Sequence, residues 1–246
     1  MRTVLSILKK LGREKGITVI LSLHEVDLAL KSCDAAVMVK DGKIADMGLP
    51  EKVGSNEAIC RLYDIECAGF SAFLGTMELS NPGGPDVFVA GGGGKATNIY
   101  RQLTRSNIGF VTGILHENDV DCHIAKTMGV RVVTERPFEP MGEKAVNKAK
   151  ELVNRAEIVI DSGFPVSDIN IANQKLILEA AIGGKRVYTL RDELERKRLF
   201  GEWAGKMSYC MTAAEIMTCC GDSHHTGERD CIGKHICGGG NELDNI

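Results

Sequence analysis

The sequence contains no long run of apolar residues. No stretch approaches the roughly 18 consecutive apolar residues that a membrane-spanning helix needs. The short apolar stretch of residues 4–8 is followed by charges, and no small-residue cleavage site comes after it. This is not the pattern of an export signal. We therefore expect a cytosolic chain.

The sequence also lacks an excess of charge of one sign. Its formal net charge is -3, and acidic and basic residues are mixed along the chain. Domains that bind nucleic acids or anionic lipid surfaces usually carry a basic patch or tail. We accordingly expect no nucleic-acid partner.

Cysteine is the residue type whose distribution needs an explanation. Five of the nine cysteines lie after residue 209. Without an export signal, reduced thiols are the better expectation. Thiolate and imidazole are ligands that transition metals prefer, so the tail is a candidate metal site with these ligands: Cys219, Cys220, His224, His225, Cys231, His235 and Cys237. No pair has the two-residue gap of a zinc knuckle, and a flexible tail that binds nothing is the alternative.

The first part of the chain combines helical and strand patterns. The spacing of apolar residues predicts a helix over 4–15, a buried strand over 17–23, a helical stretch up to 31, a hairpin of strands 35–40 and 44–47, and a helix over 51–63. Asp41-Gly42 is the usual signature of a two-residue hairpin turn. His24 follows the predicted buried strand directly, which is where α/β proteins place ligands.

Two motifs in this part carry a resemblance. Residues 17–29 read ITVILSLHEVDLA, and residues 33–44 read CDAAVMVKDGKI. In this order they resemble the end of an ABC nucleotide-binding domain, most closely that of the iron-siderophore, haem and cobalamin importers. The resemblance covers about residues 1–65.

The resemblance implies a role for His24 and a set of partners. His24 matches the switch histidine that contacts the γ-phosphate and holds the attacking water, which fits what an imidazole can do in phosphoryl transfer. ATP and Mg are implied for the full-length parent, with a second ATPase subunit and membrane permease subunits as partners. The implied location is peripheral, at the inner face of the cell membrane. A histidine that only hydrogen-bonds Glu25 or Asp27 is the alternative.

The motifs that bind ATP in this family are not found in the 246 residues. There is no Walker A loop, no signature sequence, and no Walker B aspartate with a following glutamate. Without them nothing cradles the phosphates or ligates magnesium. We therefore expect that this chain alone does not hydrolyse ATP and that residues 1–65 are only marginally stable.

The second part alternates strands and helices. Strands are predicted over 87–90, 109–115, 131–133, 157–160 and 186–190, and helices over 95–104, 119–128, 142–154, 171–182 and 191–204. Five strands separated by helices predict a doubly wound, parallel, Rossmann-like sheet. The expected organisation is an ABC fragment (1–67), a linker rich in Gly, Ser, Asn and Pro (68–85), the Rossmann-like domain (86–205), and a Cys/His-rich tail expected to be flexible (206–246).

A glycine-rich corner is the candidate ligand site of the second domain. Gly91, Gly92, Gly93 and Gly94 separate a predicted strand from a predicted helix, and Lys95 stands at the helix start. Backbone amides and the positive end of a helix form a natural anion site. Ala96 after the lysine excludes a Walker A loop. A dinucleotide, another phosphate or carboxylate ligand, and a purely structural turn all stay open.

Polar residues follow other predicted strands at the same edge. His116, Glu117, Asn118 and Asp161 should converge on the glycine corner, because strand-end loops of a parallel sheet meet. Asp119 is either part of this site or an N-cap. The domain resembles the extra carboxy-terminal domain of some prokaryotic importer ATPases, and its attachment to a transporter motor suggests that it senses a small anionic ligand.

Three hypotheses follow. The first is a carboxy-terminal portion of an importer ATPase, for iron-siderophore or cobalamin uptake, with an appended ligand-sensing domain. The second is an independent nucleotide- or dinucleotide-dependent enzyme over residues 86–190, with a remnant transporter segment. The third is a second domain that only mediates dimer contacts, against which its polar strand-end loops argue.

Overall fold

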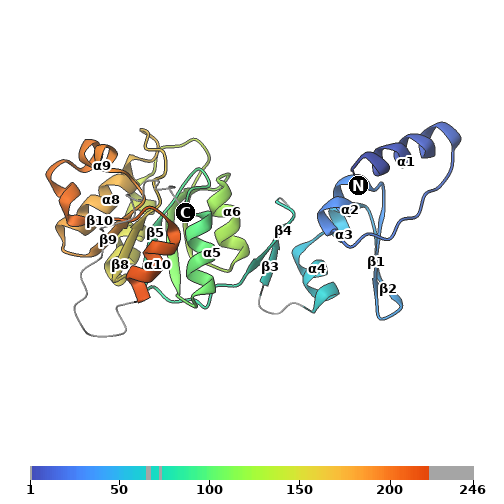
Figure 1. Cartoon of the computed structure of the whole chain (residues 1–246), viewed down its shortest axis with the longest axis horizontal. Coiled ribbons are helices and arrows are strands. Elements are labelled where there is room, and N and C mark those ends of the chain that lie inside the picture. The colour runs from blue at the N-terminus through green and yellow to red at the C-terminus, as the bar shows by residue number, and fades with distance from the viewer. Residues whose placement is uncertain (1, 65–67, 72–73, 222–246) are drawn as a thin grey trace, which may run out of the picture.

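A computed structural model gives the fold of the chain and describes residues 2–64, 68–71 and 74–221 (Figure 1). An α/β domain follows a smaller amino-terminal segment, and a short hairpin lies between them in the sequence. Within the described ranges, no helix has both the length and the apolar character needed to cross a bilayer.

The α/β domain is built on one six-stranded sheet. Its strands are β5 (Val87–Ala90), β6 (Phe110–His116), β7 (Val132–Glu135), β8 (Ile158–Asp161), β9 (Arg186–Thr189) and β10 (Met207–Tyr209). They lie in the order β10-β9-β8-β5-β6-β7, and every neighbouring pair is parallel. The first strand of this sheet, β5, therefore lies in its middle. The chain then extends the sheet on one side through β6 and β7 and on the other side through β8, β9 and β10.

Helices cover both faces of this sheet. They are α5 (Thr97–Arg105), α6 (Val120–Thr127), α7 (Glu143–Arg155), α8 (Ile171–Ile182), α9 (Glu193–Phe200), the 3-10 turn η1 (Gly201–Lys206) and α10 (Ala213–Gly221). Side chains alternate along β5, so Phe88 belongs to the core with α7 and α8, whereas Val87 and Val89 belong to the core with α5, α6 and α10. The doubly wound α/β class predicted from the sequence is confirmed.

The strand count and the extent of the tail were predicted wrongly. The five predicted strands are present, but β10 adds a sixth, and α10 follows it. Three residues are too few to show a period, so β10 could not be predicted from periodicity. Ile216 of α10 is fully buried, and Cys210 and Cys220 join it in the core that includes α5. Burial of these side chains explains why residues 207–221 are part of the fold.

The amino-terminal segment contains helices and one hairpin. Its elements are α1 (Arg2–Lys15), α2 (Val26–Ser32), β1 (Ala36–Lys40), β2 (Lys43–Gly48), α3 (Pro50–Val53) and α4 (Asn56–Tyr63). The predicted Asp41-Gly42 turn is present, with φ of 50° and 72°. The single helix expected over 51–63 is divided in two, because Ser55 caps α4 by accepting a hydrogen bond from the Ala58 amide at 3.2 Å.

The strand predicted over residues 17–23 is absent. These residues form neither helix nor strand, and Ile20 is 91% exposed. A buried parallel strand requires neighbours on both sides, and no strand in the described part of the chain pairs with this stretch. Seven large apolar side chains are consequently exposed along this part of the segment: Val4, Ile7, Leu11, Ile17, Val19, Ile20 and Leu21.

The range predicted as a linker contains a hairpin that is attached to the α/β domain. It consists of β3 (Ala68–Ser71) and β4 (Thr76–Leu79), which pair antiparallel. Glu78 is buried on β4 and accepts two hydrogen bonds from the Arg101 guanidinium on α5, at 3.0 and 2.5 Å. Such bidentate pairs are geometrically specific, so this hairpin has a defined position against α5.

The contrast between the unpaired residues 17–23 and the central strands of the sheet predicts a wide range of hydrogen-exchange rates. We expect the amides of residues 17–23 to exchange at least about a thousandfold faster than those of β5 and β8, because the former are exposed and the latter are paired on both sides. Native-state exchange followed by mass spectrometry measures both. Equal protection of the two regions would mean that residues 17–23 are paired in solution.

Candidate functional site

A cleft of about 260 Å³ opens at the carboxyl ends of β5, β6 and β8. It is lined by Gly91, Gly92, Gly93, Ile114, Leu115, His116, Asp119, Met141, Pro165, Ser167, Ile169 and Asn170. Because β5 has β6 on one side and β8 on the other, this is where the winding of the sheet reverses. Open α/β sheets bind their ligands at such switch points. The cleft is therefore the candidate ligand site.

The glycine corner forms one wall of the cleft. Gly92, Gly93 and Gly94 have φ of 144°, 64° and 75°, values that other residues rarely adopt. This backbone turns the chain from β5 into α5 and directs several amides toward one point. The predicted convergence of backbone amides is thus present, but these amides donate their hydrogen bonds to side chains of the protein itself.

Two aspartates at the start of α6 accept these hydrogen bonds. Asp121 Oδ2 accepts from the Gly92 amide at 2.9 Å and from the Ala96 amide at 3.1 Å. Its Oδ1 accepts from the Thr97 hydroxyl at 2.8 Å. Asp119 Oδ2 accepts from the Gly93 amide at 2.8 Å, and its Oδ1 caps α6 through the Asp121 amide. The anion at the glycine corner is accordingly the protein's own Asp121 carboxylate, supported by Asp119.

Burial controls the electrostatics of this corner. Asp121 is 0% exposed, and its burial raises the pKa of the carboxyl above the ordinary value, while hydrogen bonds from Ala96, Thr97 and Gly92 act in the opposite direction. Those bonds stabilise the charged carboxylate in place. A phosphate would have to displace this carboxylate to reach the same amides.

Of the other residues predicted for this site, some line the cleft and others do not. His116 lines the cleft at the end of β6, and its Nε2 lies 2.8 Å from the Glu139 carbonyl oxygen. Glu117, Asn118 and Lys95 are exposed, and none of these three lines the cleft. Lys95 lies two residues before α5.

Asp161 was predicted to bind ligand but is buried beneath the cleft wall. Its Oδ2 accepts from Arg191 Nε at 2.8 Å and from the Thr189 hydroxyl at 2.9 Å, and its Oδ1 accepts from the Gly163 amide. Neither Asp161 nor Arg191 is more than 1% exposed. Burial raises the pKa of Asp161, and the charge of Arg191 opposes that rise. The two form a buried ion pair rather than a ligand contact.

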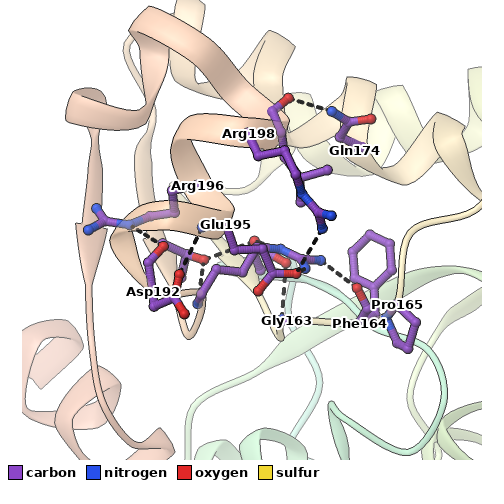
Figure 2. Close-up of polar contacts among 12 residues, drawn as sticks. Gly163, Phe164, Pro165, Gln174, Asp192, Glu195, Arg196 and Arg198 are labelled. Carbon is purple, nitrogen blue, oxygen red and sulfur yellow. Dashed lines mark hydrogen bonds and ion pairs between the residues drawn. The ribbon is translucent and has the colours of Figure 1, made fainter.

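Arg191 links this pair to the wall of the cleft. Its Nη2 donates to the Phe164 carbonyl at 2.6 Å, and its Nη1 donates to Glu195 at 2.6 Å. The guanidinium also lies 5.0 Å from the centre of the Phe164 ring. Figure 2 shows Glu195 of α9 on one side of this cluster and the Gly163, Phe164 and Pro165 loop on the other. Pro165, which lines the cleft, is therefore held in place through its neighbour.

Two asparagines hold the backbone of the cleft, and of these Asn173 was not predicted. Asn173 on α8 is fully buried and bonds both the amide and the carbonyl of Ile114, each at 2.8 Å. Asn170 accepts from the Ser167 amide at 2.7 Å and donates to the Pro165 carbonyl at 2.8 Å. Both hold backbone that forms the cleft. No periodicity marks such residues, although Asn at the start of a helix is a general signal for local bonding.

His24, Cys219 and Cys220 are not among the residues that line this cleft. His24 is exposed and precedes α2. Cys219 and Cys220 belong to α10, and burial raises the pKa of the Cys220 thiol to about 11. His224, His225, Cys231, His235 and Cys237 lie outside the described residues. Across residues 2–64, 68–71 and 74–221, no group of side chains is arranged to hold a metal ion.

Comparisons with known proteins give two kinds of relative. An uncharacterized ABC transporter ATP-binding protein, MJ0873 of Methanocaldococcus jannaschii, is 34% identical over 111 residues, covering 44% of this chain and 38% of that protein. The cobalamin import ATP-binding protein BtuD of Halobacterium salinarum is 28% identical over 142 residues, covering 54% of this chain and 36% of that protein. The chain thus spans less than two fifths of the length of either relative.

The α/β domain has a further match. The MJ0874 family matches residues 110–223. The uncharacterized protein MJ0874 of M. jannaschii is 32% identical over 81 residues, which cover 33% of this chain and 87% of that protein. No solved structure matches the chain significantly. Because nearly the whole of MJ0874 is matched at this identity, the chain belongs to the MJ0874 family.

Proposed function

We propose that the chain is a carboxy-terminal portion of an ABC importer ATPase subunit that carries a ligand-sensing α/β domain. The observation that carries this proposal is the similarity to two ABC transporter ATP-binding proteins, one of them named for cobalamin import. The exposed apolar side chains of residues 4–21 support it, because the neighbouring strands of a complete ATP-binding domain would cover them. Cobalamin or an iron-siderophore is the proposed transported substrate.

In this function residues 1–64 are the end of the ATP-binding domain. His24 contacts the γ-phosphate of ATP and orients the attacking water, with Mg held by residues of the completed domain. A second ATPase subunit and the membrane permeases are the proposed partners, at the inner face of the membrane. The ATPase activity belongs to that larger assembly.

The cleft of the α/β domain is the proposed sensing site. Its position at the switch point of the sheet and its partly apolar lining are typical of small-molecule sites. A dinucleotide-dependent enzyme is the second candidate. It is favoured by the strand order β7-β6-β5-β8-β9-β10, which is the order of dinucleotide-binding folds. The Asp121 carboxylate at the glycine corner disfavours it.

The role of His24 is tested in a polypeptide that joins the ATP-binding motifs to residues 1–246. We expect His24→Ala to lower kcat for ATP hydrolysis by about a hundredfold, the usual effect of removing one group that positions a proton or water. The exposed neighbour Glu25 provides a matched control, and Glu25→Gln should stay within about threefold of the parent. A His24→Ala enzyme as active as the control would remove His24 from the mechanism.

A further inference from the structure

We propose that the cleft beside the glycine corner selects a small ligand with a cationic or hydrogen-bond-donating head group and an apolar body, and that Asp119 is the residue that reads the head group. The proposal rests on the sensing function proposed above and adds the chemical class of the ligand. The sequence led us to expect an anionic ligand, and the proposed ligand is instead a cation or a hydrogen-bond donor.

The charge of the cleft is the first argument. Asp119 is the charged side chain among its lining residues, and in the part of the chain that the structure describes no lysine or arginine lines the cleft. An anionic ligand would meet this carboxylate with no cation to offset it. Like charges at close range in a partly buried site repel strongly. A cation or a donor group is favoured for the same reason.

The occupancy of the amides is the second argument. Phosphate sites at glycine loops use the free backbone amides at the start of the helix. Here the Gly92 and Ala96 amides donate to Asp121, and the Gly93 amide donates to Asp119. A phosphate at this corner would break these bonds and move a buried carboxylate, whereas a ligand that approaches Asp119 from the cleft leaves them intact.

The third argument is that the Asp119 carboxylate keeps hydrogen-bond acceptor positions for a ligand. The Glu139 carbonyl accepts from Nε2 of the His116 ring, and the Asn170 side chain accepts from the Ser167 amide and donates to the Pro165 carbonyl. Each carboxylate oxygen of Asp119 accepts one backbone bond and retains a second acceptor position. Asp119 is half-buried and faces the cleft, so it is placed to accept from a ligand.

The rest of the lining defines the body of the ligand. Met141, Pro165 and Ile169 are apolar lining residues that are at least partly exposed, and Ile114 and Leu115 also belong to the lining but are buried. Small-molecule sites typically combine such a surface with a few polar groups that fix orientation. A volume of about 260 Å³ accommodates a six-membered ring with one head group.

Three probes of one shape test the proposal. Cyclohexylmethylamine, cyclohexylmethanol and cyclohexanecarboxylate differ in the head group, and the binding of each to the 246-residue chain is measured by NMR chemical-shift titration and calorimetry. We expect the amine to bind about tenfold more tightly than the alcohol and the carboxylate to bind more weakly than both. Inorganic phosphate and NAD are titrated in the same buffer and should not bind.

A variant assigns the preference to Asp119. Asp119→Asn should reduce the ratio of amine to alcohol affinity to within about twofold, because the charge is lost while an acceptor for the α6 cap is kept. Asp192→Asn is the matched control, since Asp192 caps α9 in the same way and does not line the cleft. Its amine preference should equal that of the parent. The ratio of amine to alcohol affinity stays informative even if Asp119→Asn lowers stability, because both affinities are measured on the same variant.

The outcomes separate the two levels of the proposal. If the carboxylate or phosphate binds most tightly, the ligand class is wrong and the sensing cleft stands. If NAD binds most tightly, the dinucleotide-dependent enzyme is favoured, and both the ligand class and the sensing function are overturned. If no probe binds, both the ligand class and the sensing function of the cleft are overturned. An amine preference that persists in Asp119→Asn overturns the role of Asp119.

Discussion

Replacing Arg191 with methionine is expected to lower the free energy of unfolding of the α/β domain by about 3–5 kcal/mol, the usual cost of leaving a buried charge without its partner. The variant loses the bonds to Asp161, Phe164 and Glu195, and Asp161 has no access to solvent. Chemical denaturation followed by circular dichroism measures the change. The cleft wall at Pro165 should lose order in the same variant, because Arg191 holds the preceding carbonyl.

The exposed Arg198 provides the matched control. It pairs with the same Glu195 at 4.0 Å, and its side chain is 74% exposed, so Arg198→Met should cost less than about 1 kcal/mol. Adding Asp161→Asn to Arg191→Met should recover part of the loss, since the unpaired charge is then removed. A loss from Arg191→Met no larger than the control would show that the buried pair does not support the fold.

The loss of free energy of unfolding caused by Arg191→Met should also depend on pH. Burial raises the pKa of Asp161 in the folded chain, and removing the Arg191 charge raises it further. The folded state then holds a proton that the unfolded state releases, so stability falls as pH rises from the ordinary carboxyl value through the raised pKa. The variant should therefore be closer to the parent at about pH 5 than at about pH 8.

Replacing Asp121 with alanine is expected to cost about 3 kcal/mol, because it leaves the buried amides of Gly92 and Ala96 without an acceptor. The vacated corner then resembles an ordinary anion site at a helix start. Added formate or phosphate should raise the melting temperature of this variant, whereas the parent should not respond. Thermal unfolding at increasing anion concentration measures both.

Asp168→Ala is the control for this prediction, because Asp168 is exposed in the loop after β8. It should change stability by less than about 0.5 kcal/mol and show no anion response beyond that of the parent. If phosphate stabilises the parent as strongly as the variant, the Asp121 carboxylate does not occupy the corner in solution, and the corner is open to a nucleotide phosphate.

The strands that the sequence predicted correctly are those with apolar runs bounded by turn residues. Val87 to Ala90 and Ile158 to Asp161 are buried on both faces, and such runs are visible in one dimension. Residues 17–23 have the same local pattern but no neighbouring strands in the described chain. A local pattern cannot show whether a partner strand is present, which is why that prediction failed.

The site was predictable in position but not in chemistry. The glycine loop and the strand-end location follow from local residues and topology. That Asp121 would enter the glycine corner depends on how α6 packs beside β5, and that Asp161 would meet Arg191 depends on contacts 30 residues apart. Those contacts arise from tertiary packing, and spacing within one motif carries no information about them.

Residues 1–64 are proposed to be the end of an ABC ATP-binding domain. The most direct measurement is to sequence the genomic DNA immediately upstream of the Met1 codon and translate every frame. We predict a coding sequence for a Walker A loop, a signature sequence and a Walker B segment, in that order and leading into residue 1. Upstream DNA that encodes none of these motifs would contradict the claim, and the likeness to transporter proteins would then reflect ancestry alone.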